Sequence, residues 1–388
     1  MKQVLLDVVE WQAAFDFETG KEVKKEDPLV KLAAEVLKKH RYPGDTSLQS
    51  IPWVIDVALE LYDSYRPGFM FLNFAQPYLM SAFVEDNPQQ WESLMALIFA
   101  QIERFAGATG MTPVVVGTGD MVPLKGYIDL SPLDGFACGG GMAPRYAGLF
   151  KPSIYDLNCV SKHKDIELIV EKERLIALFG EVQEFVERLP DFMLVAKEGF
   201  IFKTFGSAPR PFCKVQARNK TIPVYTTLGN VSSITDICPL ILTHLQDYKI
   251  ALIIVEGIGT KDFPRPCISC SNTLDWYTYA PGEGQYLSIA TGEHLANHSY
   301  PPGFKYYLED TEEKKYPFSG YFGRHLPITI GHRFRGKSAA VGTRSILTHM
   351  AGGTDISIEC FARGLYNYGT MAVIKSGDGR QADPVPPK

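Results

Sequence analysis

The feature that most constrains the fold of this chain is a set of short apolar runs that do not alternate with polar residues. The runs cover residues 4–6, 69–74, 113–117, 192–196, 222–225, 250–255 and 371–374. A strand with one face in solvent alternates apolar and polar side chains, whereas a strand covered on both faces is apolar throughout. The runs therefore predict a parallel sheet that is buried between two layers.

Segments with helical periodicity lie between these runs, at residues 29–39, 88–106, 165–189 and 355–368. In the second segment Leu94, Ile98 and Ile102 recur on one face of a helix that follows Asn87-Pro88. Strands that alternate with helices are typical of an α/β fold. We therefore predict an α/β fold with a mostly parallel central sheet and helices on both faces.

The same patterns predict one large α/β domain over residues 1–376. The alternation of strand and helix patterns stops at about residues 260–340, which are rich in Gly, Pro, Tyr and charged side chains. We expect these residues to form a long irregular insertion. The last stretch, residues 377–388, reads GDGRQADPVPPK and is expected to be a disordered tail.

Composition excludes several classes of partner. Among 388 residues, 39 are Lys or Arg and 44 are Asp or Glu, so the formal net charge of −5 argues against nucleic acid as the main partner. No apolar run approaches the roughly 20 residues that cross a bilayer, and no leader with a cleavage site is apparent, so no membrane partner is expected. Seven cysteines suit a reducing, cytoplasmic setting. A homo-oligomer is compatible with all of this.

Two acidic residues directly follow predicted strands. Glu256 comes after the run at 250–255, and Asp120 comes shortly after the run at 113–117. In parallel sheets, ligands bind beyond the carboxyl ends of the strands. Two carboxylates at neighbouring strand ends are suited to hold a divalent cation or to act as an acid/base pair. The alternative is that each is an unrelated turn residue.

Three further groups carry candidate chemistry. His294 and His298 are four residues apart and would share one helix face, where they are suited to ligate a metal. Cys267 and Cys270 form a single CxxC, which favours two reduced loop thiols without metal over a zinc site or a redox pair. A basic cluster offers guanidinium groups that suit phosphate or carboxylate, against the alternative of a solvated loop; its candidate binding residues are Arg333, Arg335 and Arg344.

Several of these segments together resemble the alkaline phosphatase superfamily, especially its phosphodiesterase and phosphomutase branches. The resemblance rests on PGFMFLNFAQP (67–77), VVVGTGDM (114–121), LPDFMLVAKEGFIF (189–202), SSITDICPLIL (232–242), IALIIVEGIG (250–259) and QYLSIATGEHLANHSYPPG (285–303). These segments cover about a third of the chain. The last two match the opening of the family but come last here, so the resemblance implies a rearranged segment order.

The resemblance also implies roles for single residues. Glu256 stands where the family has its first metal-binding Asp, Asp120 matches the Asp of a conserved Asp-His pair in which Met121 replaces the His, and Gln76 stands near another metal-binding Asp. The nucleophilic hydroxyl is expected between residues 267 and 285, and we take Ser271 and Thr273 as the candidates for catalysis. The implied cofactor is a divalent metal: Zn, Mn or Mg.

These observations lead to one functional expectation and two alternatives. We expect a phosphatase-like or phosphodiesterase-like hydrolase that acts on a small anionic phosphoester, or a degenerate relative of one. The first alternative is a non-catalytic binding or assembly protein with the same fold, whose Tyr- and Trp-rich loop forms the contact surface. The second is a redox protein that uses Cys267 and Cys270. The rearranged order also predicts that the strands at 113–117 and 250–255 are parallel and close in one sheet.

Overall fold

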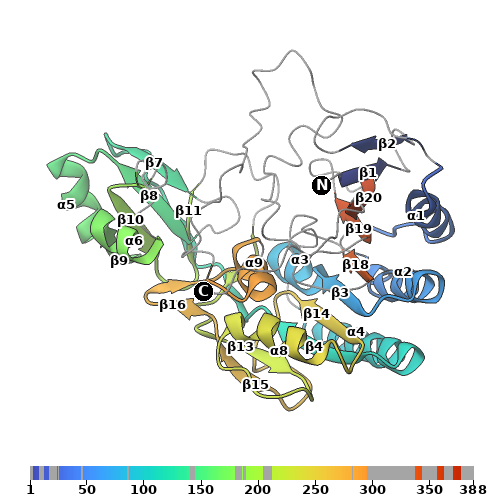
Figure 1. Cartoon of the computed structure of the whole chain (residues 1–388). Coiled ribbons are helices and arrows are strands. Elements are labelled where there is room, and N and C mark those ends of the chain that lie inside the picture. The colour runs from blue at the N-terminus through green and yellow to red at the C-terminus, as the bar shows by residue number, and fades with distance from the viewer. Residues whose placement is uncertain are drawn as a thin grey trace, which may run out of the picture.

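The computed structural model describes residues 3–7, 13–16, 24, 26–44, 47–84, 87–139, 145–179, 186, 189–203, 212–281, 283–294, 337–342, 356–361 and 370–376. Its centre is a ten-stranded sheet (Figure 1). In spatial order the strands are β15 (Ile268–Ser271), β13 (Thr221–Tyr225), β4 (Thr112–Gly117), β14 (Ile250–Val255), β3 (Phe69–Phe74), β18 (Ser338–Gly342), β19 (Ile356–Phe361), β20 (Thr370–Ser376), β1 (Gln3–Asp7) and β2 (Ala13–Asp16).

The middle of this sheet is parallel. Strands β4, β14, β3, β18 and β19 run in the same direction, and the strands outside them are antiparallel to their neighbours. β14 pairs with β4 along its whole length, which confirms that residues 113–117 and 250–255 are parallel neighbours. The register places Val255 opposite both Phe74 and Gly117, so β3, β4 and β14 end at the same level of one edge.

Alternate residues of the parallel strands pack into two cores, one on each face. On one face Met70, Leu72 and Phe74 pack with α1 (Pro28–Lys39), α2 (Ser50–Tyr65) and α4 (Pro88–Thr109). On the other face Phe69 and Phe71 pack with the 3₁₀ turn η1 (Ile234–Asp236), α8 (Ile237–His244) and α9 (Glu283–Thr291). The helical layers on the two sides confirm the predicted α/β fold and explain why the strands lack alternation.

The long helix α4 shows how local sequence sets the element bounds. The Asn87 side chain accepts hydrogen bonds from the backbone N–H groups of Gln89 (3.1 Å) and Gln90 (3.2 Å), and Pro88 occupies the first turn. The helix ends at Gly110, whose φ of 67° is left-handed and suits glycine.

A second, smaller sheet lies beside the central one (green in Figure 1). Its strands, in order, are β7 (Phe136–Gly139), β8 (Tyr146–Phe150), β10 (Phe192–Ala196) and β9 (Ile166–Glu171), and its helices are α5 (Ile154–Lys162) and α6 (Lys172–Phe179). Three short pairs join the two sheets: β5 (Met121–Pro123) with β12 (Lys214–Gln216), β6 (Gly126–Ile128) with β11 (Phe200–Phe202), and β16 (Thr273–Leu274) with β17 (Tyr277–Thr278). Among the described helices there is also α3 (Gln76–Phe83).

Two of the predicted helices are wrong. The segment 165–189 begins with β9 and only then forms α6, because the residues before Lys172 pair with β10. The segment 355–368 begins with β19, which lies between β18 and β20 in the central sheet. In both segments, backbone pairing with a neighbouring strand overrides a helical spacing of apolar residues.

The expected irregular insertion at 260–340 is described only in part. Its described portion contains β15, the β16–β17 hairpin and α9, so that portion holds regular structure. The expected tail at 377–388 lies outside the described residues, and the single-domain boundary stays a prediction. None of the described helices combines the length and apolar character needed to cross a membrane.

Candidate functional site

Three neighbouring parallel strands change from apolar to polar at the edge where they end. On the face covered by α8 and α9, Phe71 is followed two residues later by Asn73, Ile254 by Glu256, and Val116 by Thr118. Because successive side chains of a strand point to opposite faces, these three polar residues continue the apolar rows of that face. All three are fully buried.

Helix α9 covers this edge with polar side chains of its own. Gln285, Tyr286, Ser288 and Thr291 of α9 are all buried. The Asn73 amide donates to Glu256 Oε1 (3.2 Å) and lies 3.3 Å from the Tyr286 hydroxyl. The Gln285 amide donates to the Thr118 carbonyl oxygen (3.4 Å) and to Asn272 Oδ1 (2.9 Å). Asn73 is thus linked to Glu256 and Tyr286, and Gln285 is linked to Thr118. Together with Gln76, the buried first residue of α3, we call these residues the strand-edge cluster: Asn73, Gln76, Thr118, Glu256, Gln285 and Tyr286.

Several buried atoms of the strand-edge cluster have no hydrogen-bond partner within the described part of the chain. There, Asn73 Oδ1 and Gln285 Oε1 each lack a donor, and Gln76 lacks a partner for both Nε2 and Oε1. Gln76 is the first residue of α3, directly beyond β3, and its side chain is fully buried. Buried polar atoms are almost always paired, because an unpaired amide loses its bonds to water and gains nothing in exchange. A group of buried polar atoms without hydrogen-bond partners at one edge of a sheet is typical of a ligand site.

The loops that follow β4 and β14 hold each other in place. The Gly257 N–H donates to Thr118 Oγ1 (2.9 Å), and the Gly119 N–H donates to the Ile258 carbonyl (2.9 Å). Gly257 has a φ of 75°, and a Cβ there would lie 2.8 Å from Tyr78 Cα. The left-handed backbone and the close approach of α3 both require glycine at this position.

Asp120 lies at the neighbouring strand end, as predicted, but its surroundings differ from those of Glu256. The carboxyl packs on Gly259, where a Cβ would lie 2.1 Å from Asp120 Cγ. Burial, together with the negative charge of Asp262, raises the pKa of Asp120 above its ordinary value. Its main chain is fixed by Asn219, whose Oδ1 accepts from the Asp120 N–H (2.8 Å).

The two candidate nucleophiles, Ser271 and Thr273, lie on either side of Asn272 in the sequence. Ser271 Oγ and Thr273 Oγ1 lie 3.4 Å apart. Asn272 stands between them, is fully buried, and is the residue that contacts Gln285. Neighbouring side chains of an extended segment point to opposite sides. The hydroxyls of Ser271 and Thr273 thus lie on the other side of this segment from the Asn272 side chain, which is the one that contacts Gln285.

The other predicted ligands are placed only in part. His294 Nδ1 lies 3.1 Å from the Tyr279 hydroxyl, and burial lowers the pKa of this histidine. His298, Arg333, Arg335 and Arg344 lie outside the described residues. Within the described ranges, no three or more His, Cys, Asp or Glu side chains are grouped as a metal site.

The CxxC thiols lie on opposite faces of the sheet. Cys267 packs against the core of α1, α2 and α4, whereas Cys270 is buried in the core of α8 and α9. Both are free, and burial raises the pKa of Cys270 to about 12. Because a disulfide needs Cβ atoms about 4 Å apart and directed at each other, this arrangement does not support a redox pair.

The donor atoms of the strand-edge cluster fit one kind of metal. Glu256 offers a carboxylate, and Asn73, Gln76 and Gln285 offer amide oxygens that have no partner. Carboxylate and amide oxygens are ligands of Mg²⁺, Mn²⁺ or Ca²⁺, whereas zinc favours His and Cys. Of the cofactors expected from the sequence, Mn and Mg fit the described residues better than Zn does.

Most of this cluster is not predicted from the sequence. Asn73 and Gln285 are not candidates there, and Gln76 enters only through the family resemblance. Tyr286 is expected only as part of the aromatic contact surface of the non-catalytic alternative, a role that its burial does not support. One signal was present: Asn73 is the single polar residue in the run FMFLNF. The contacts of Gln285 and Tyr286 depend on how α9 packs over the sheet, which no local pattern reveals.

Comparisons with known proteins add little to this picture. No protein-family model matches the chain, and no curated protein matches it. Among solved structures, the chain is similar to a phosphonoacetate hydrolase from Sinorhizobium meliloti 1021, crystallised with phosphonoacetate, at 13% sequence identity and a TM-score of 0.34. The match covers 55% of this chain and 56% of that enzyme. A similarity this low carries no conclusion about activity, so function must be argued from the site.

Proposed function

We propose that the chain is a divalent-metal-dependent phosphoester hydrolase whose substrate, a small anionic phosphoester, binds at the strand-edge cluster. The observation that supports this most is that the buried amide oxygens of Asn73, Gln76 and Gln285 have no partner among the described residues, at the strand edge that also buries Glu256. A cation bound by these oxygens would fill their hydrogen-bonding capacity, balance the buried carboxylate and attract an anion. The edge of the parallel strands is also where α/β enzymes bind their substrates.

In this proposal each residue has a stated role. Glu256, Asn73 and Gln76 would hold the cation, which would supply Lewis-acid polarisation of a phosphoryl oxygen. The hydroxyl of Ser271 or Thr273 would attack phosphorus as the ester P–O bond breaks, and its proton would pass through a carboxylate such as Asp120 to the leaving alcohol. Water would then attack the phosphoryl group, release phosphate and return the proton to the hydroxyl. Asp120 suits proton transfer because its pKa is raised toward neutrality.

The anionic substrate requires positive charge, and Arg333, Arg335 and Arg344 are proposed for this from the sequence alone. An arginine that binds phosphate equally in the ground state and the transition state contributes uniform binding. Arg335→Ala is therefore expected to raise KM more than it lowers kcat.

Hydrolysis assays with a matched pair of variants test the proposal. The wild-type chain is offered generic phosphomonoesters and phosphodiesters with Mn²⁺, Mg²⁺ or Zn²⁺, beside Glu256→Gln and the exposed control Glu92→Gln. We expect turnover that requires Mn²⁺ or Mg²⁺, is abolished in Glu256→Gln and is unchanged in Glu92→Gln. Turnover that survives in Glu256→Gln, or that requires no metal, would contradict the assigned role.

A non-catalytic binding protein is the second candidate, and one observation favours it. The hydroxyls of Ser271 and Thr273 bond each other, while the residue between them contacts the strand-edge cluster. A protein of this kind would bind Mn²⁺ and an anionic ligand without turnover of any ester in the panel. The same assay, run beside a binding measurement, therefore separates the two functions.

A further inference from the structure

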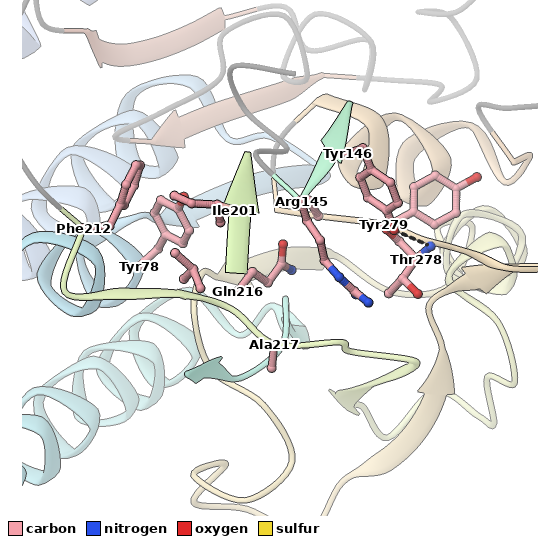
Figure 2. Close-up of a pocket in the computed structure, with 11 residues that line it drawn as sticks. Tyr78, Arg145, Tyr146, Ile201, Phe212, Gln216, Ala217, Thr278 and Tyr279 are labelled. Atoms are coloured by element: carbon pink, nitrogen blue, oxygen red, sulfur yellow. Dashed lines mark hydrogen bonds between the residues drawn. The ribbon is translucent and has the colours of Figure 1, made fainter. Parts of the chain in front are cut away.

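A narrow pocket lies between the small sheet and the central sheet, close to the strand-edge cluster (Figure 2). About 490 Å³ of space lies between its walls, part of it open to solvent, and the part that admits a water-sized group is narrow. Its aromatic walls come from Tyr78 of α3, Tyr146 of β8, Phe212 and Tyr279. Flat aromatic walls around a narrow space suit a planar ring, which stacks on such surfaces with little loss of freedom.

Two side chains that line this pocket each carry an N–H donor with no acceptor among the described residues: Nε2 of Gln216 and Nη1 of Arg145. Gln216 Nε2 is buried, and none of the described residues accepts a hydrogen bond from it. Arg145 uses Nε to donate to the Ala196 carbonyl (2.9 Å) and Nη2 to donate to Glu167 Oε2 (2.8 Å), and no bond of its Nη1 is found within the described residues. Both residues line the pocket, and Figure 2 shows their side chains directed into the same space. The pocket therefore lacks acceptors that a ligand could supply.

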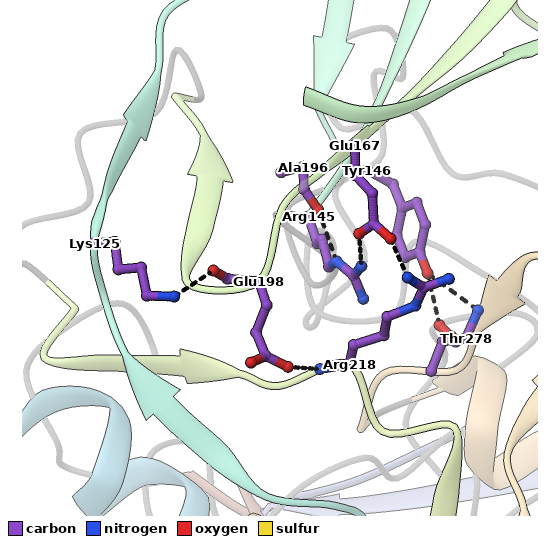
Figure 3. A network of polar contacts seen from close by, with 8 residues as sticks. All are labelled: Lys125, Arg145, Tyr146, Glu167, Ala196, Glu198, Arg218 and Thr278. Carbon is purple, nitrogen blue, oxygen red and sulfur yellow. Dashed lines mark hydrogen bonds and ion pairs between the residues drawn. The ribbon is translucent and has the colours of Figure 1, made fainter. Parts of the chain in front are cut away.

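The charges around Arg145 leave it partly unneutralised (Figure 3). Glu167 is shared, because Arg145 binds one of its oxygens and Arg218 binds the other. The same network holds a second carboxylate, Glu198, which accepts from the Arg218 N–H (2.9 Å), and a third cation, Lys125, which donates to the Glu198 carbonyl (3.2 Å). The cations therefore outnumber the carboxylates, and positive charge remains beside the pocket. Only 12% of the Arg145 side chain is exposed, which keeps solvent from screening that charge fully.

The pocket adjoins the strand-edge cluster on two sides. The Tyr78 backbone packs on Gly257, the residue after Glu256. Asn272 donates to the Tyr279 carbonyl (2.9 Å) and accepts from Gln285 of the cluster. A substrate with its phosphoryl group at the cluster would thus place its organic part at the mouth of the pocket.

We propose that this pocket binds a planar aromatic ring that carries a carboxylate, as the leaving group of an aryl phosphoester. The two carboxylate oxygens accept from Arg145 Nη1 and Gln216 Nε2, and the ring lies between the tyrosines. The role as a leaving-group site depends on the function proposed above, whereas binding of the ring acid itself does not.

Titration calorimetry with 4-hydroxybenzoate, the free leaving group, tests the pocket directly. A carboxylate bound by an N–H is expected to raise affinity about tenfold or more, so 4-hydroxybenzoate should bind that much more tightly than 4-methylphenol. Gln216→Leu should weaken 4-hydroxybenzoate binding about tenfold, and Gln216→Glu should abolish it by repulsion. The exposed control Gln246→Leu should bind as the wild type does.

A second readout separates this proposal from the proposed function. With turnover, Gln216→Leu should lower kcat/KM for 4-carboxyphenyl phosphate and leave methyl phosphate unchanged, and both Gln216 variants should bind Mn²⁺ normally. Absence of 4-hydroxybenzoate binding, or equal binding by Gln216→Leu, would overturn the pocket. Binding that responds to Gln216 in a chain that hydrolyses no ester would support the pocket and overturn the hydrolase.

Discussion

Replacing Gln76 with methionine should stabilise the metal-free protein and weaken its response to metal. Gln76 is fully buried, and neither polar atom of its amide has a partner in the part of the chain that the structure describes. An unpaired buried amide costs about 1–3 kcal/mol, and methionine keeps nearly the same volume without that cost. With about 2.1 cal/mol/K of unfolding entropy per residue, 388 residues give about 0.8 kcal/mol/K, so Tm should rise by about 1–4 °C.

The same substitution should reduce the stabilisation that added metal gives to the protein. At a Mn²⁺ concentration about a hundredfold above its Kd, the wild type should gain about 2.7 kcal/mol, or about 3 °C in Tm. Gln76→Met should gain markedly less, because one ligand is missing. Differential scanning calorimetry with and without Mn²⁺ measures both effects, and Gln89→Met, on the exposed surface of α4, serves as the control. A lower Tm for metal-free Gln76→Met would show that this amide is a structural group and would refute the reasoning.

Three further predictions follow from single positions. Gly257→Ala should lower the free energy of unfolding by about 1–3 kcal/mol in urea titrations, since its left-handed backbone and the close backbone of α3 leave no room for a Cβ; an unchanged stability would contradict this. Because the pKa of Asp120 is raised in the folded protein, the protonated carboxyl favours folding at acid pH, and this contribution is lost as pH rises through that pKa. Asp120→Asn should therefore be more stable than the wild type at neutral pH, and the difference should vanish below the ordinary carboxyl pKa. Urea titrations at several pH values measure this difference, and a variant that is less stable than the wild type at neutral pH would contradict the prediction. Mild oxidation of the native protein should yield no bond between Cys267 and Cys270 by peptide mass spectrometry, because the sheet separates them.

The sequence predicted the parallel core because burial on both faces leaves a direct mark on composition. The run IALIIV coincides with β14, and the run FMFLNF coincides with β3. In both strands, successive apolar side chains pack alternately into the core on one face of the sheet and the core on the other. Residues 166–171 and 356–361 show where this reasoning fails. Their strand state depends on partners that are distant in the sequence, and a helical spacing of apolar residues gives no hint of those partners.

The candidate site, like the fold, was predicted only where it depends on residues that are close in the sequence. Glu256 and Asp120 follow strands directly, so their place at one edge can be read from the order of residues. Gln285 and Tyr286 reach that edge only because α9 folds back over it, and Asn272 only because β15 pairs with β13. The roles of Arg333, Arg335 and Arg344 stay predictions from sequence.

The most direct test of the account is a calorimetric titration of Mn²⁺ into the full chain in the presence of inorganic phosphate. The account predicts one bound ion per chain in the wild type, no detectable binding in Glu256→Gln, and weaker binding in Gln76→Met. Equal binding by all three proteins, or none in the wild type, would show that the buried polar edge of β3, β4 and β14 is not a cation site.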